Sequence, residues 1–173
     1  MKNRIQFLHD QIRETRDFTN RLISKLPKEL WFEVPAHTDM NFAWQIGHLI
    51  VSQNFHCITV IHGRNARIFD SMPIMKYNRS FYGMGTEHRS IEQGIYPASQ
   101  LQEHLDLIQQ IALELLWRLP EEQLDDPLEK VPLKHPLAKT KYEALSWSFK
   151  HEMWHCAEME LVKRLIGKPI EWL

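Results

Sequence analysis

Apolar residues recur every three or four positions in four separate stretches of the chain, which is the spacing of amphipathic helices. The first stretch ends at Pro27, and its inward seam is Ile5, Leu8, Ile12, Thr15, Thr19, Leu22 and Leu26. The second begins after Asn41, which suits a helix N-cap, and runs through Ile61 to the stop signal Gly63. The pattern therefore predicts two long helices early in the chain.

Two more helices are predicted in the second half of the chain. The third has Ser99 and Gln102 as a capping box and is closed by Pro120. The fourth opens with another capping box, Thr140 with Glu143. It runs to Leu165 or Ile166, and Gly167 and Pro169 are its stop signals.

The connections between these helices differ in length. Residues 64–96 mix glycine, proline and asparagine with scattered aromatic residues and predict a long loop, which is a candidate lid over a site. Residues 120–139 contain four prolines and hold no long helix. No strand-like alternation and no internal repeat is present. We therefore expect one all-α domain over residues 1–173, a four-helix bundle whose long second connection leaves helices two and three parallel.

Composition and charge narrow the classes of function. The 173 residues are 43% hydrophobic and 25% charged, with a formal net charge of -1. This balance leaves no basic surplus for a phosphate backbone, so nucleic acid is not an expected partner. No apolar stretch has the length of a membrane span, and the N-terminus is not a signal peptide, so we expect a cytoplasmic protein without a membrane partner. Two cysteines, Cys57 and Cys156, fit a reducing compartment.

The clearest chemical motif is H-E-x-x-H, formed by His151, Glu152 and His155 within the fourth helix. Residues four apart lie on one helix face about 6 Å from each other, so both imidazoles can reach one divalent cation. The same motif begins the site of zinc proteases, in which the glutamate is the base. Here no glycine and third histidine follow, and no sheet is predicted to hold a peptide. We therefore expect a metal site that is completed elsewhere. Glu152 lies about 100° around the helix from His151, so we expect its side chain to be solvated.

His48 on the second helix is the candidate third ligand. It lies 15 residues before Gly63, whereas His151 and His155 lie 11 and 15 residues after Thr140. If the second and fourth helices are antiparallel, these positions have similar depth in the bundle, where facing helices place metal ligands.

The stripe of the fourth helix that carries His151, His155 and Glu158 is apolar at both ends. Burying such groups without partners would cost roughly 2 kcal/mol or more per group, so the stripe predicts a cation or a dense hydrogen-bond network. The alternative for each candidate ligand is a structural role in the core or on the surface. Loops or helix faces are expected for His56, His62 and His88.

The W-Q-I-G-H-L segment at residues 44–49, the long connection after the second helix and the pair of His151 and His155 resemble the DinB/YfiT-like superfamily of small bacterial proteins. The resemblance covers most of the chain and implies an up-down-down-up four-helix bundle. It implies one divalent metal ion, nickel or zinc foremost with manganese or iron as alternatives, held by His48, His151 and His155. Relatives with this pattern are often homodimers, so the resemblance also permits a homodimer here.

One residue departs from the family pattern. Glu158 stands where many relatives have a glutamine three residues after the last histidine. Its carboxylate is expected to act as a fourth ligand, or as a base that hydrogen-bonds to one of the ligands.

Three neutral imidazoles would leave positions for water or a substrate group, so we expect a metal-dependent enzyme with a small-molecule substrate. Two reaction classes fit this site. In hydrolysis, the metal lowers the pKa of water toward about 7. In thiol transfer, which the resemblance suggests, a low-molecular-weight thiol attacks an electrophile as thiolate. The alternative function is a non-catalytic metal or small-molecule binding protein of the same fold.

Overall fold

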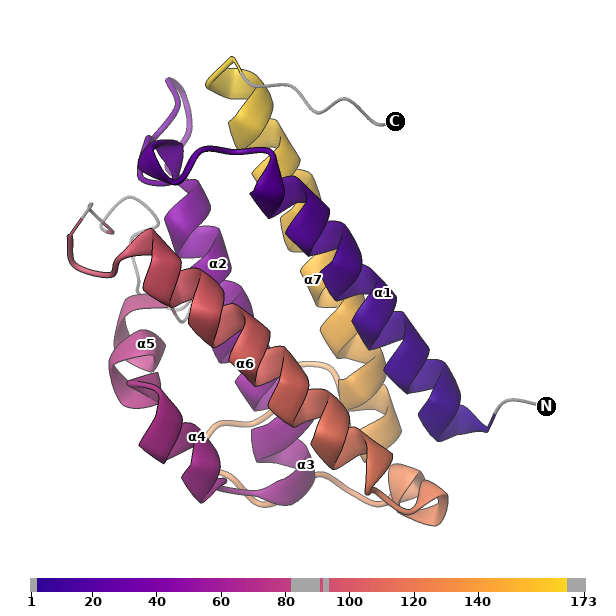
Figure 1. Ribbon diagram of the computed structural model, residues 1–173. Helices are drawn as coiled ribbons and strands as arrows, with labels where there is room; N and C mark the ends of the chain where they lie inside the picture. Colours follow the sequence, from indigo (N-terminus) through magenta and orange to yellow (C-terminus); the bar gives the residue numbers. More distant parts are fainter. Residues whose placement is uncertain (1–2, 82–90, 92–93, 168–173) are drawn as a thin grey trace.

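A computed structural model describes residues 3–81, 91 and 94–167 of the chain (Figure 1). The secondary structure of these residues is helical, and their single β-type contact is an isolated bridge between Pro127 and Thr140. The all-α class predicted from the sequence is therefore confirmed.

The first and fourth predicted helices correspond to α1 and α7. α1 spans Arg4–Ser24 and is capped by Asn3, whose side chain accepts a hydrogen bond from the first turn. α7 spans Lys141–Leu165 and opens with the predicted capping box, in which the side chains of Thr140 and Glu143 accept hydrogen bonds from each other's backbone. Both ends of α7 agree with the local sequence signals.

The second predicted helix continues to its expected end but is not uniform. α2 spans Phe42–Gln53, and the side chain of Asn41 caps it as predicted. A π-helical segment, η2 (Asn54–Thr59), leads into the short α3 (Val60–His62). The chain then turns at Gly63, which has a φ of 76°. A π-turn rotates the side chains within it relative to an α-helix, and such segments are frequent at functional sites.

The prediction of a loop over residues 64–96 is wrong for the first half of this range. Two short helices lie there, α4 (Ala66–Ser71) and α5 (Ile74–Phe81). The buried residues of α5 have helical spacing, but over two turns only, so the pattern was too short to predict a helix; they are Ile74, Tyr77 and Phe81. Residues 82–90 and 92–93 of the predicted loop, with His88, lie outside the described residues.

The third predicted helix, α6, spans Ala98–Trp117 and starts earlier than expected. Its N-cap residue is Pro97, and no side chain caps it, so the predicted capping box of Ser99 and Gln102 is wrong. Proline fixes the entry of the chain, and both predicted capping residues fall inside the helix. Two short 3-10 turns complete the described elements, η1 (Lys28–Leu30) and η3 (Glu121–Asp125).

Four long helical segments surround the apolar core (Figure 1). α1 packs against α6 and α7, and α2 packs against the same two helices from the other side. α5 covers α2. The buried apolar residues form one cluster, and its largest fully buried members are Trp31, Trp44, Tyr77, Phe42 and Phe81.

A buried ion pair crosses this core between α1 and α7. Nε and Nη2 of Arg16 donate to the two carboxylate oxygens of Glu152, at 2.6 and 3.1 Å, and the residues are 2% and 3% exposed. The hydroxyl of Thr19 donates to the same carboxylate at 2.7 Å. The expectation of a solvated Glu152 is therefore wrong. Glu152 follows His151 directly, so its side chain is rotated by about 100° around α7 and lies inside the bundle.

Arg16 also connects the other two long helices. Its guanidinium donates to the backbone carbonyl of Leu105 on α6, at 2.7 Å, and to the side-chain oxygen of Gln53 on α2, at 3.0 Å. Gln53 donates in turn to Gln109 on α6. The guanidinium therefore donates hydrogen bonds to groups on α2, α6 and α7. A buried charge is tolerated when it is paired and hydrogen-bonded in this way.

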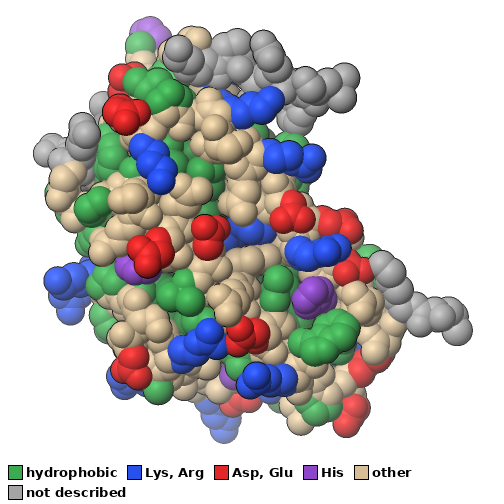
Figure 2. Space-filling view, viewed as in Figure 1, with side chains coloured by type: hydrophobic (Ala, Val, Ile, Leu, Met, Phe, Trp, Pro, Cys, Tyr) green, Lys and Arg blue, Asp and Glu red, His purple; other side chains and the backbone are tan. Residues whose placement is uncertain are grey.

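The face of the molecule in Figure 2 has mixed charge. On the face shown in Figure 2, basic and acidic side chains are interspersed, and neither sign forms a continuous patch. No helix in the described part of the chain combines the length and the apolar character needed to cross a membrane.

We expect Arg16→Met to lower the free energy of unfolding by about 3–5 kcal/mol, because it leaves the Glu152 carboxylate buried without its counter-charge. Replacing both residues by methionine should recover part of this loss. Urea denaturation measures the effect, and Arg67→Met is the control. Arg67 pairs with Glu114 at the surface, with 47% of its side chain exposed, so its loss should stay below about 1 kcal/mol. Equal losses for the two arginines would contradict the prediction.

Candidate metal centre

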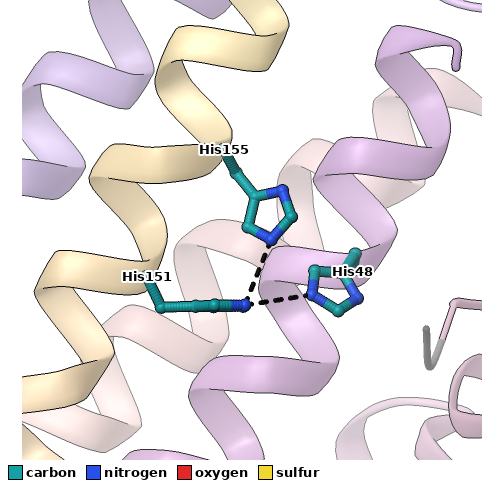
Figure 3. A group of neighbouring side chains, drawn as sticks. All are labelled: His48, His151 and His155. Atoms are coloured by element: carbon teal, nitrogen blue, oxygen red, sulfur yellow. Dashed lines mark hydrogen bonds between the residues drawn. The ribbon is translucent and has the colours of Figure 1, made fainter. Parts of the chain in front are cut away.

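Three histidines from two helices turn their imidazoles toward one point between α2 and α7 (Figure 3). His48 lies on α2, and His151 and His155 lie one turn apart on α7. Nε2 of His151 is 3.4 Å from Nε2 of His48 and 3.1 Å from Nε2 of His155. The structure thus brings together the three histidines selected from the sequence, and each offers one atom that could bind a metal ion.

Hydrogen bonds hold the outer nitrogens of two of these rings. Nδ1–H of His48 donates to the carbonyl oxygen of Phe81 at 2.7 Å. Nδ1–H of His155 donates to Oε1 of Gln45 at 2.6 Å and to Oε2 of Glu158 at 2.8 Å. A neutral imidazole carries one proton, so both rings turn the lone pair of Nε2 toward the centre. Proteins commonly orient metal-binding histidines in this way.

The arrangement fits a divalent cation better than it fits the imidazoles alone. Without a cation, a proton on Nε2 of His151 can satisfy only one of the two facing lone pairs at a time. Metal–nitrogen bonds of about 2.0–2.1 Å at tetrahedral angles place neighbouring nitrogens about 3.3–3.4 Å apart. The observed separations of 3.1 and 3.4 Å are close to this value. The three residues could therefore hold a metal ion.

The surroundings of His151 keep its ring neutral. Burial, followed by the neighbouring His155 and His48, lowers the pKa of His151 from 6.5 to about 3. Because only a neutral imidazole binds a cation, His151 is in its binding form at neutral pH.

The W-Q-I-G-H-L segment provides the geometry around His48. The indole of Trp44 stacks on the imidazole of His48, with ring centroids 4.8 Å apart and planes inclined by 8°. Gly47 leaves room for the ring of Phe81, which a Cβ at this position would overlap. Since the carbonyl of Phe81 accepts the hydrogen bond from His48, the close approach of α5 to α2 orients this imidazole.

The two glutamates of the motif region have different positions. Glu158 contacts Nδ1 of His155, the ring nitrogen that faces away from the other two histidines. Glu152 is bound to Arg16 and Thr19 in the core. Glu152 is therefore unavailable as the base of a zinc-protease site, and the described residues contain no strand that could hold a peptide.

A comparison against known families identifies the family of the chain. The sequence profile of the DinB superfamily matches residues 11–159. The chain belongs to the DinB superfamily. No curated protein sequence matches it. The region that this DinB-superfamily chain shares with the profile includes all three histidines of the centre.

Two further histidines, not expected at the centre from the sequence, lie beside it in this DinB-superfamily protein. His56, expected on a loop or helix face, is only 5% exposed, and its ring centroid lies 5.3 Å from that of His151. Nε2 of His135, from the proline-rich segment, lies 2.9 Å from Nδ1 of His56. A regular helix would place His56 about 80° around from His48, and the π-helical turn reduces this offset. In the sequence, the sign that His56 could lie near the centre is its spacing of eight residues from His48, about two helical turns.

Both cysteines are buried and have reduced thiols. The thiol of Cys57 hydrogen-bonds to Ser148 and that of Cys156 to Thr19. Burial raises the pKa of each thiol to about 12. Since the thiolate is the reactive form, neither cysteine is poised as a nucleophile.

Gly47→Ala should displace the ring of Phe81 and disturb the hydrogen bond that orients His48. Overpacking of this kind costs about 1–3 kcal/mol of stability. Loss of an orienting hydrogen bond weakens metal affinity about 10–100-fold. Urea denaturation and titration with Zn²⁺ measure the two effects, and the additional change Phe81→Leu should relieve part of both. An unchanged affinity in Gly47→Ala would show that this contact does not orient His48.

His151 should make the stability of the metal-free protein depend on pH. Its pKa is about 3 when folded and near the ordinary 6.5 when unfolded, so between these values the unfolded chain binds more protons. This contribution to stability is complete above about pH 7 and is lost as the pH falls below 6.5. Urea denaturation in EDTA between pH 7.5 and 5 should give a flatter profile for His151→Gln than for the wild type. The exposed His37 provides the control, because His37→Gln should keep the wild-type slope.

Proposed function

We propose that this chain binds one divalent metal ion through His48, His151 and His155 and acts as a metal-dependent enzyme on a small-molecule substrate. The proposal rests on one observation. Nε2 of His151 lies 3.1 Å from Nε2 of His155 and 3.4 Å from Nε2 of His48, while other groups hold the outer nitrogens of His48 and His155. Nickel or zinc is the proposed ion, and imidazole nitrogen suits both. Iron and manganese are the alternatives.

Glu158 is proposed to act through His155. Its carboxylate accepts a hydrogen bond from Nδ1 at 2.8 Å, which increases the basicity of the ring and holds its orientation. This contact favours a supporting role over that of a fourth ligand. Three nitrogen ligands leave at least one position for water or a substrate group.

Two reaction classes are compatible with such a centre. A bound divalent cation supplies a Lewis acid that lowers the pKa of water or of a thiol. Hydrolysis would use water, and thiol transfer would use a low-molecular-weight thiol. The buried cysteines have a pKa of about 12, so a thiol transferase of this design would take its thiol from solution. The alternative is a non-catalytic binding protein that uses the same centre.

For the fold, the proposal is an up-down-down-up bundle. Its support is the contact of each long helical segment with two others, and the long connection between α3 and α6. In this arrangement α2 and α7 are antiparallel, which puts His48 level with the two histidines of α7.

Untagged wild-type protein is expected to hold or take up about one divalent ion per chain, measured by mass spectrometry. His48→Ala, His151→Ala and His155→Ala should each lose this ion, because two imidazoles remain. Glu158→Gln should keep the stoichiometry with an affinity about 10–100-fold weaker.

The exposed His62 provides the control for the metal measurement, since His62→Ala should bind like the wild type. Undiminished metal content in all three ligand variants would rule the centre out. With the metal identified, turnover in hydrolysis or in thiol transfer separates the two reaction classes. A loaded protein that catalyses neither reaction would favour the binding-protein alternative.

A further inference from the structure

His56 is a buried polar side chain that the three-histidine centre does not use as a ligand. It is 5% exposed and lies in the π-helical segment η2. Among the described residues, its side chain makes one hydrogen bond, from Nδ1 to His135. Its other ring nitrogen, Nε2, has no hydrogen-bond partner in the described part of the chain. This nitrogen is therefore open to a hydrogen bond with a ligand or a water molecule.

The hydrogen bonds of His135 determine which nitrogen of His56 carries the proton. The backbone N–H groups of Leu137 and Ala138 donate to Nδ1 of His135, at 3.2 and 2.8 Å. This nitrogen therefore has a lone pair, and the proton of His135 is on Nε2. Nε2–H of His135 then donates to Nδ1 of His56 at 2.9 Å. The single proton of a neutral His56 is left on Nε2. With this tautomer, Nε2–H of His56 is a hydrogen-bond donor.

The position of His56 relates this donor to the centre. Its ring meets the ring of His151 edge to face, with centroids 5.3 Å apart and planes inclined by 71°. The two nitrogens of an imidazole diverge, so Nε2 is directed away from His135. The proline-rich segment 120–139 thus holds one side of the ring through His135, and Nε2 on the other side has no partner among the described residues.

We infer that His56 is a binding residue of the centre, and that its Nε2–H donates to an anionic oxygen, sulfur or nitrogen atom of the ligand held there. His135 is a positioning residue, because it holds His56 in the tautomer that donates. The inference rests on the proposed metal centre and narrows its substrate class to molecules that bring an anionic group beside the three histidines. Hydrogen bonds to ionised acceptors are among the strong ones in proteins.

The test measures azide binding to the cobalt-loaded protein by visible absorption. His56→Asn keeps an oxygen near the position of Nδ1, which can accept the bond from His135, and has no donor near the position of Nε2. His56→Gln places its amide N–H near the position of Nε2. His56→Asn should weaken azide binding about tenfold, whereas His56→Gln should keep most of the affinity. The control is His62→Asn at an exposed site, which should bind azide like the wild type.

A second measurement needs no metal. Nitrogen-15 NMR of the metal-free protein should show His56 as the Nε2–H tautomer. His135→Phe keeps an aromatic ring where the imidazole stacks on Phe55, at 5.7 Å between centroids, but it removes the donor to Nδ1. In this variant both tautomers of His56 should appear, and azide binding should weaken by less than in His56→Asn.

Three results would overturn the inference, and they separate it from the metal proposal. Wild-type azide affinity in a fully loaded His56→Asn would remove His56 from the ligand site. An Nδ1–H tautomer in the wild type would remove the donor. Loss of cobalt from both His56 variants would make His56 a metal ligand. If the wild type takes up no cobalt, the metal proposal and this inference fail together.

Discussion

The ion pair of Arg16 and Glu152 is the interaction on which the rest of the structure depends. It is buried between α1 and α7, and Arg16 also binds α2 through Gln53 and α6 through a backbone carbonyl. A rotation of α7 that lost this pair would leave a charge in the apolar core, which is among the most costly defects in a folded protein. Because Glu152 follows His151 directly, the rotation that buries the carboxylate also presents His151 and His155 to α2.

Two groups of buried polar side chains therefore have opposite characters. Around Arg16 the charges and hydrogen bonds are matched within the protein, and such a network mainly specifies how the helices meet. At the centre, the inner nitrogens of three imidazoles face one another while the outer nitrogens of His48 and His155 are occupied. The inner nitrogens cannot all find hydrogen-bond donors among themselves, and a cation can bind their lone pairs. The first group stabilises the fold, and the second is suited to binding.

The connecting segments also contribute to the centre. α5 brings the carbonyl of Phe81 to His48, and this approach requires a glycine at position 47. The proline-rich segment brings His135 to His56. Each of these two connections therefore holds an imidazole beside the centre. The π-helical segment adds the rotation that brings His56 close to His151.

The sequence by itself determined the features that depend on residues within one or two helical turns. The Thr140 capping box, the N-cap at Asn41 and the common face of His151 and His155 are of this kind. The depth of His48 followed from helix lengths together with the antiparallel direction expected for the second and fourth helices. Tertiary structure decided the rest. Glu152 is buried because Arg16, 136 residues away, meets it in the core, and no local pattern encodes that contact. His56 and His135, 79 residues apart, meet only because the bundle folds the proline-rich segment against η2.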